Sequence, residues 1–178
     1  MKSRIESYAQ PFVKIELDAR SDHWPIETMS VIPYVADVSG ISTIENISIR
    51  VLGAERTFWE KATILHAIRN GSKLRARMSR HYYDVFAMVD SPIFNKAIEN
   101  IDLLLKVAEH KALFFKDVKA RYDLAKPGSL LLMPKNEHIA QLNADYEQMQ
   151  QMFFEDSPSF ENILEKLKIA ENKINGNE

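Results

Sequence analysis

The 178-residue chain contains no cysteine, which excludes a disulfide scaffold, a thiolate zinc site and a cysteine nucleophile. Its 5 glycines and 7 prolines are few for this length, and this favours helices over an all-β fold. No run approaches the roughly 18 apolar residues of a membrane-spanning helix, and Met1 is not followed by the apolar run of a signal peptide. We therefore expect a soluble, cytoplasmic protein with no membrane partner.

The charge balance excludes some classes of protein but leaves local basic patches possible. Lys and Arg number 23 against 25 Asp and Glu, for a net charge of -2, which is not typical of a strongly basic nucleic-acid coat protein. P-loop, Rossmann and hydrolase-elbow motifs are absent, and the 5 histidines show no metal-ligand spacing. With 46% apolar and 27% charged residues, the composition is that of a globular domain.

The apolar pattern changes its period along the chain. Alternation predicts strands over residues 12–19, 28–35 and 44–52, and a 3.6-residue spacing predicts helices over 54–70, 79–89, 93–122, 136–154 and 158–174. Ser79 is expected to cap the second helix. The order predicts an α+β fold with a small, incomplete sheet in residues 1–53, a helical part in 54–125 and C-terminal helices in 126–178. Four aromatic residues are expected in the core: Phe114, Phe115, Phe153 and Phe154.

Two ionisable residues lie where the predicted backbone would fix their direction. Glu16 is on the charged face of the first strand, a position suited to metal binding or to a surface pair with Lys14 or Arg20. Lys61 shares a helix stripe with Phe58, so its ammonium either extends to solvent or points at an anion such as phosphate. The residues alone leave both pairs of alternatives open.

A second carboxylate and a basic run follow. Asp84 lies four residues after Arg80, so it either forms a local ion pair or positions Lys61 or a substrate. The basic run is either a solvated loop or a contact for triphosphate or an RNA backbone, and it comprises Lys73, Arg75, Arg77 and Arg80.

Five segments together resemble one known family. They are V-K-I-E-L-D-A-R (13–20), R-V-L-G-A-E-R-T-F-W-E-K-A-T-I-L-H (50–66), S-R-H-Y-Y-D (79–84), Y-D-L-A-K-P-G-S-L (122–130) and M-F-F-E-D-S-P-S-F (152–160). In these segments the chain closely resembles the AbiEii/AbiGii toxin family of nucleotidyltransferases, whose fold is of the DNA-polymerase-β type. The likeness covers roughly residues 11–174.

The resemblance implies an activity and partners. Family members transfer a nucleoside monophosphate from a nucleoside triphosphate to an acceptor, by in-line attack on the α-phosphate with Mg²⁺ bound by carboxylates. Several are toxins of type IV toxin–antitoxin or abortive-infection systems, and tRNA is an acceptor in some. A nucleoside triphosphate, tRNA and a cognate antitoxin protein are therefore the expected partners.

The resemblance also implies roles for individual residues. Glu16 is similar to the family's third metal-binding carboxylate, Lys61 to its nucleotide-contacting lysine, and Asp84 to its essential helix aspartate. All three are expected to face one cleft. Arg56 and Arg80 are further expected to contact the nucleotide.

The chain departs from the family pattern at two places. His81 stands where the family has an acidic residue, and the family's first motif, a Gly-Ser or Gly-Gly turn followed by an Asp-x-Asp strand, is absent. Because Mg²⁺ requires several oxygen ligands in near-octahedral geometry, Glu16 alone cannot hold two metal ions. We therefore expect a truncated reading frame that begins at an internal Met and is inactive alone. The alternatives are a non-catalytic remnant that binds nucleotide, RNA or a partner protein, and a helical scaffold without a ligand.

A sheet without its neighbouring strands predicts self-association. An edge such as residues 13–17 would present unpaired backbone groups, and edges of that kind recruit another chain. We expect a homo-oligomer with the N-terminal β part at the contact. The alternative is a monomer in which residues 1–10 or the helices cover the edge.

Overall fold

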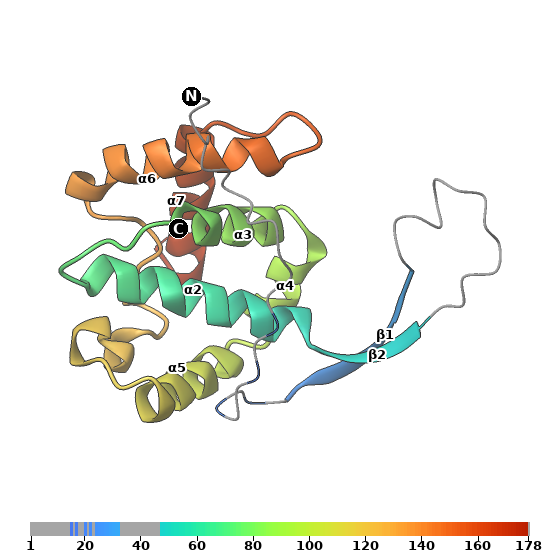
Figure 1. Cartoon of the computed structure of the whole chain (residues 1–178). Helices are drawn as coiled ribbons and strands as arrows, with labels where there is room; N and C mark the ends of the chain where they lie inside the picture. The colour runs from blue at the N-terminus through green and yellow to red at the C-terminus, as the bar shows by residue number, and fades with distance from the viewer. Residues whose placement is uncertain are drawn as a thin grey trace, which may run out of the picture.

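The computed structural model describes residues 15, 17, 20, 22, 24–32 and 47–177. Within this part, an antiparallel ribbon precedes a body of helices, so the fold is α+β as the sequence predicts (Figure 1). The ribbon consists of β1 (Ile26–Val31) and β2 (Ile47–Leu52). The helices are α2 (Ala54–Asn70), α3 (Ser79–Val89), α4 (Pro92–Glu99), α5 (Asp102–Phe114), α6 (Asn136–Met149) and α7 (Phe160–Asn175), with short 3-10 turns η1 (Val118–Ala120), η2 (Tyr122–Leu124) and η3 (Gln150–Met152). No helix of these residues is long and apolar enough to cross a membrane.

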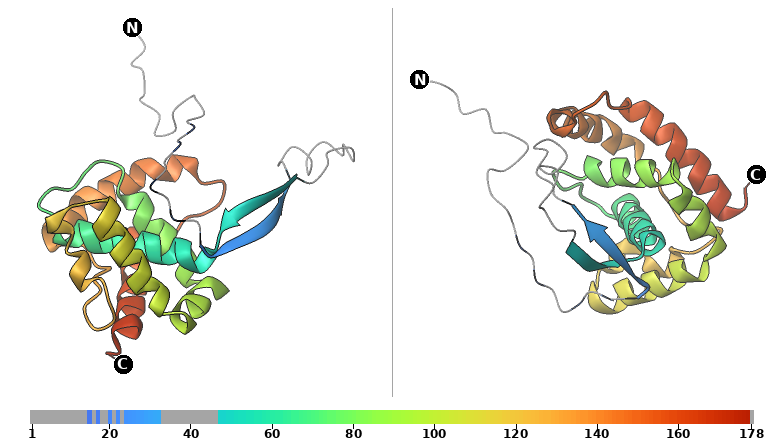
Figure 2. Two further views of the ribbon diagram at one scale, coloured as in Figure 1. Left: turned by 90° about the horizontal axis from the view of Figure 1, so that it is seen from below. Right: turned by 90° about the vertical axis from the view of Figure 1, so that its right-hand side faces the viewer.

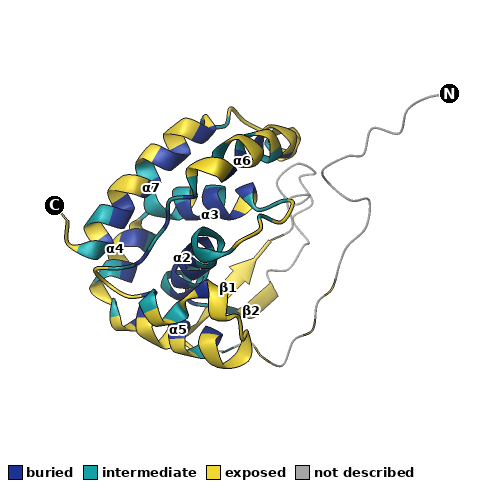
Figure 3. Ribbon diagram, turned by 90° about the vertical axis from the view of Figure 1, so that its left-hand side faces the viewer, coloured by how far each residue is buried: buried dark blue, intermediate teal, exposed yellow. Residues whose placement is uncertain are grey.

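Helix α2 lies at the centre of the body, against α3, α4 and α5 (Figure 3). Its side chains Phe58, Trp59, Ala62 and Leu65 are all fully buried, because spacings of three and four residues place them on one broad face. Burial of one large apolar side chain stabilises the fold by about 1.5–3 kcal/mol. A single core cluster joins residues from α2 through α7, so parts 54–125 and 126–178 share one core.

Buried polar groups attach the segment after η2 to the helices around it. A carboxylate oxygen of Glu171 on α7 accepts the N–H groups of Leu132 and Met133, at 2.6 and 3.1 Å. His66 on α2 accepts the N–H of Leu131 at its Nδ1, 3.1 Å away. Burial lowers the pKa of His66, so its imidazole stays neutral and can accept this bond.

The ribbon projects from the N-terminal end of α2, away from the helical body (Figures 1 and 2). Its register pairs Met29 with Ile49 and Val31 with Ile47, and directly opposed residues share a face. One face is therefore apolar, and these four side chains are all exposed. A two-stranded ribbon is only marginally stable alone, so this face is suited to burial against another surface.

The strand predictions are met in part. β1 begins two residues before the predicted second strand, and β2 lies inside the predicted third strand, while residues 33–35 and 44–46 lie outside the described part. Most of the predicted first strand also lies outside it. The two described apolar residues of that segment, Ile15 and Leu17, are not in a strand, and they are 82% and 94% exposed.

The helix predicted over residues 93–122 is wrong as a single element. It is divided at Asn100 into α4 and α5, and α5 ends at Phe114 before η1 and η2. The physical reason is packing. Ala97 on α4 and Leu104 on α5 both reach full burial in the core around α2, and the two helices contact α2 separately. The turn between them allows both contacts.

The predicted cap at the start of α3 is also wrong. Ser79 is the first helical residue and makes no capping hydrogen bond to the following N–H groups. Instead, Asp145 on α6 accepts the N–H and the hydroxyl of Ser79 at 2.9 and 2.6 Å, and the N–H of Arg77 at 3.0 Å. A carboxylate from another helix thus satisfies the donors that a local cap would satisfy.

Candidate functional site

Lys61 on α2 and Asp84 on α3 meet across two neighbouring helices. The Lys61 ammonium lies 2.7 Å from Oδ2 of Asp84, and the two side chains are 30% and 37% exposed. The local pair between Arg80 and Asp84 does not form within the described residues, because Asp84 turns to Lys61 and Arg80 stays exposed. The packing of α2 on α3 thus brings together two of the three residues expected in one cleft.

His81 forms the wall beside this ion pair. Its Nδ1 lies 3.9 Å from Oδ2 of Asp84, and the ring is buried. Burial, together with the charges of Lys61 and Arg80, lowers the pKa of His81 to about 4, and the charge of Asp84 opposes this only in part. The imidazole is therefore neutral at physiological pH, and it does not supply the negative charge of the acidic residue that the resemblance implies at this position.

Lys111 on α5 is a second cation near the pair, which the sequence reasoning missed. It is only 8% exposed, and its ammonium donates to the backbone oxygen of Glu60 at 2.7 Å. Burial, together with the charges of Lys61 and Arg56, lowers the pKa of Lys111 to about 8, and the charge of Glu60 opposes this only in part. The sequence did contain a signal for the burial of Lys111, because this residue lies four positions after Val107 on the apolar stripe of α5.

The charges that act on His81 are mainly positive. Lys61, Lys111 and Arg80 all act on His81, whereas Asp84 is the only carboxylate among the charges that act on it. A cluster with more cations than carboxylates favours an anion, and phosphate oxygens accept strong charge-assisted hydrogen bonds from ammonium groups. The arrangement can therefore bind a phosphate group, with Asp84 holding the direction of Lys61.

Arg56 lies at the start of α2 and is 1% exposed. Its guanidinium donates to the backbone oxygen of Trp24 at 2.7 Å, and it forms ion pairs with Asp22 and Glu60 at 3.0 and 3.1 Å. Arg56 thus connects the segment before β1 to α2. Its contact with a nucleotide stays a prediction.

A hollow of about 320 Å³ opens beside Lys111 and Glu60. Its other lining residues come from the segment before β1, the end of β2, α2 and the region of α5 to η2, and they are Arg20, Asp22, Leu52, Ile64, His110, Phe115 and Tyr122.

The expectation that all four helix-end phenylalanines are core residues is wrong. Phe114, Phe115 and Phe154 are exposed, and only Phe153 packs against the core.

The expected metal site cannot be assembled from the described residues. Glu16, the predicted ligand, lies outside them, and Asp84 is already paired with Lys61. Within the described part, no group of three His, Asp or Glu residues could hold a metal ion. These residues alone do not fit Mg²⁺, and the role of Glu16 stays a prediction.

Comparison with known proteins gives one finding. No curated protein and no solved structure matches the chain. A family model described as nucleotidyl transferase AbiEii toxin, type IV TA system, matches residues 1–166, a range that contains both Lys61 and Asp84. The chain belongs to the AbiEii family of nucleotidyl transferase toxins.

Proposed function

We propose that this chain binds the phosphates of a nucleoside triphosphate through Lys61, with Asp84 holding the lysine in place. In this proposal the bound nucleotide is the donor for transfer of a nucleoside monophosphate to an acceptor such as tRNA. Membership of the AbiEii family supports the nucleotidyltransferase-type function. The observation that carries the assignment to this site is the 2.7 Å ion pair between α2 and α3.

The ion pair leaves Lys61 able to bind a second anion. An ammonium group has three N–H donors, and Asp84 uses one of them. With 30% of the side chain exposed, phosphate oxygens can reach the others. Asp84 keeps the ammonium between α2 and α3, which reduces the entropy lost when a phosphate binds. Lys111 and Arg80 add positive charge beside the pair, and the Glu60 carboxylate that acts on Lys111 is itself paired with Arg56.

Binding and transfer are separate expectations for this chain. The described residues give Mg²⁺ no ligand set, and the 178 residues contain no Asp-x-Asp motif. We therefore propose that the chain alone binds nucleotide but shows no appreciable transfer. The second candidate function is a non-catalytic module that binds nucleotide, RNA or a partner protein such as an antitoxin.

Calorimetry with ATP, GTP, CTP and UTP, without divalent metal, tests the site. Lys61→Ala should weaken binding at least tenfold, because one charge-assisted phosphate contact contributes about 1.5–3 kcal/mol. Asp84→Asn should weaken it less, because the ammonium remains but is no longer held. The matched control is Lys166→Ala, which removes the exposed ion pair between Lys166 on α7 and Asp90 after α3.

Two results would contradict the site assignment: unchanged nucleotide affinity of Lys61→Ala, or an equal loss in the Lys166→Ala control. A transfer assay with radiolabelled triphosphate, Mg²⁺ and total tRNA then separates the two candidate functions. We expect no labelling of tRNA by the chain alone. Labelling that Glu16→Gln abolishes would show instead that these 178 residues contain a complete catalytic site.

A further inference from the structure

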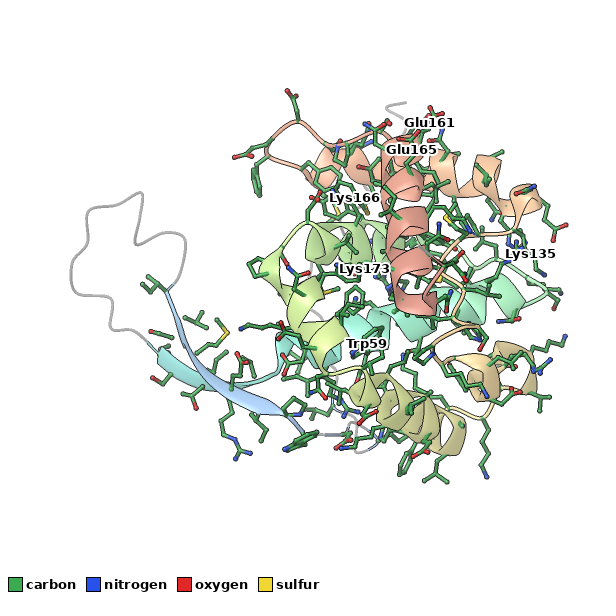
Figure 4. The ribbon with its side chains drawn as sticks, turned by 180° about the vertical axis from the view of Figure 1, so that it is seen from behind. Trp59, Lys135, Glu161, Glu165, Lys166 and Lys173 are labelled. Atoms are coloured by element: carbon green, nitrogen blue, oxygen red, sulfur yellow. The ribbon has the colours of Figure 1, made fainter. Side chains whose placement is uncertain are left out.

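Five cations from separate elements gather where α2 ends and α6 begins. We call this surface the basic end, and it consists of Arg69, Lys73, Arg75, Lys119 and Lys135. Figure 4 shows Lys135 beside the end of α2, whereas Glu161 and Glu165 lie on α7, along another side of the molecule. The sequence displays only Lys73 and Arg75 as a run, so the other three join them through folding.

Hydrogen bonds fix the position of three of these side chains. Lys135 donates to the backbone oxygen of Gly71 at 2.7 Å, and Lys119 donates to the Ser72 hydroxyl at 3.2 Å. Arg69 donates to the backbone oxygen of Pro134 at 3.1 Å. Lys135 at the N-cap of α6 and Lys119 in η1 therefore direct cations at the loop after α2, and Arg69 in the last turn of α2 reaches the residue before Lys135.

The basic end has no carboxylate partners within the described residues. The hydrogen bonds of Arg69, Lys119 and Lys135 go to two backbone oxygens and one hydroxyl, and Lys73 and Arg75 are exposed. Residues 61–83 contain six Lys and Arg and no Asp or Glu. A chain of net charge -2 thus concentrates five cations at one end, and none of them forms an ion pair within the described residues.

The surface beside the loop is an open hollow of about 590 Å³ with mainly polar walls. Its lining residues are Arg69, Asn70, Leu131, Lys135, Asn136 and Glu137. Cations and amides contact phosphate oxygens in nucleic-acid complexes, and they outnumber the one carboxylate of this lining, Glu137. A protein partner would favour aromatic or apolar anchors in a buried centre, and Leu131 is the one apolar side chain in this lining.

We propose that the basic end binds the phosphodiester backbone of a nucleic acid strand. The proposal rests on the proposed function in one respect: the basic end would hold the RNA acceptor outside the Lys61 site. Arg69 lies eight residues after Lys61 on the same helix, which is roughly 12 Å along the axis. A strand bound at the basic end can therefore extend toward the nucleotide site.

Fluorescence anisotropy with a labelled 20-nucleotide single-stranded RNA, without nucleotide, tests this binding. Five phosphate contacts predict that log K falls with log salt at a slope of about -3.5. The variant that combines Lys73→Ala, Arg75→Ala and Lys119→Ala should bind at least tenfold more weakly, with the slope reduced in magnitude by about 2. It leaves the backbone hydrogen bonds of Arg69 and Lys135 intact.

The control variant combines Lys96→Ala, Lys166→Ala and Lys173→Ala, which removes three charges from α4 and α7, and it should bind RNA as the parent does. Circular dichroism verifies that both triple variants fold. Duplex RNA and single-stranded DNA of the same length are tested as further ligands. Binding of either with an affinity comparable to that of single-stranded RNA supports a backbone contact.

Three results would overturn the proposal: no salt-dependent binding to any of the three nucleic acids, an equal loss of affinity in both triple variants, or binding of polyglutamate with the affinity of RNA. Lys61→Ala separates this proposal from the preceding one. If it loses nucleotide affinity and keeps RNA affinity, the two surfaces act independently. Loss of RNA affinity alone in the basic-end variant leaves the nucleotide site supported.

Discussion

The buried ammonium of Lys111 makes the stability of the protein depend on pH. Burial lowers its folded-state pKa to about 8 from an ordinary value of 10.5. Between these values the unfolded chain binds more protons than the folded chain, so the free energy of unfolding rises with pH. Below pH 8, where both states are charged, the fold bears the full cost of burying the charge.

Lys111→Met should therefore raise the free energy of unfolding at pH 7, by about 1–3 kcal/mol, because a flexible apolar side chain replaces a buried cation. The gain should shrink as the pH rises from 8 toward 10.5. Urea unfolding at several pH values measures this, with the exposed Lys106→Met on the same helix as the control. A gain that is independent of pH would show that the Lys111 ammonium is not desolvated.

At the scale of single residues, the sequence could predict those whose spacing shows which face of a helix they lie on. Lys61 and Asp84 were both singled out, because each lies on a recognisable helix face within a family motif. Their mutual contact depends on how α2 packs on α3, which no local pattern encodes. Arg56 was expected at the nucleotide, but its buried contacts are with Asp22 and Trp24, 34 and 32 residues earlier in the chain. Long-range contacts of this kind cannot be read from spacing.

Among the elements, the start of α3 depends on a carboxylate from α6. Asp145 accepts three hydrogen bonds there, from two backbone N–H groups and the hydroxyl of Ser79. Hydrogen bonds to charged groups are stronger than neutral ones, and the donors left after removal of the carboxylate would lack an acceptor. The contact therefore joins two helices and caps one of them.

Asp145→Ala should lower the free energy of unfolding by about 2–3 kcal/mol, more than the roughly 1 kcal/mol typical of a lost local cap. Urea unfolding at neutral pH measures the change. Asn143→Ala, which removes an exposed hydrogen bond to Glu147 on the same helix, should change stability by less than about 0.5 kcal/mol. Equal effects of the two substitutions would exclude a capping role for Asp145.

Element boundaries were predictable where a stop signal coincides with the end of a periodic pattern. Gly71 follows α2, and Asp90 and Ser91 separate α3 from Pro92 at the start of α4, so the predicted bounds of α2 and α3 match the structure. The break between α4 and α5 carries no glycine or proline. The break arises because α4 and α5 pack against α2 in different directions. The apolar spacing of the sequence continues through the break and therefore does not indicate it. The cap at Ser79 failed for a similar reason, since a distant carboxylate replaces the local side chain.

The whole molecule combines a well-packed helical body with a projecting β-ribbon. The body supplies its own core, whereas all twelve ribbon residues are at least partly exposed. The apolar face of the ribbon carries Met29, Val31, Ile47 and Ile49, and the opposite face carries Ser30 opposite Ser48. Exposed apolar side chains on one face of a two-stranded ribbon favour association with a second surface, since their burial removes apolar area from water.

We expect this face to hold two copies of the chain together. Light scattering at tens of micromolar should give the mass of a dimer or larger assembly, because packing the apolar faces of two ribbons against each other removes these side chains from water. Met29→Lys combined with Ile49→Lys should shift the mass toward the 20.5 kDa of one chain, since buried lysines would be unpaired. Ser30→Lys combined with Ser48→Lys adds the same charge to the other face and should leave the assembly intact. A strictly monomeric parent chain, or equal dissociation by both pairs of substitutions, would show that the apolar face of the ribbon does not mediate self-association.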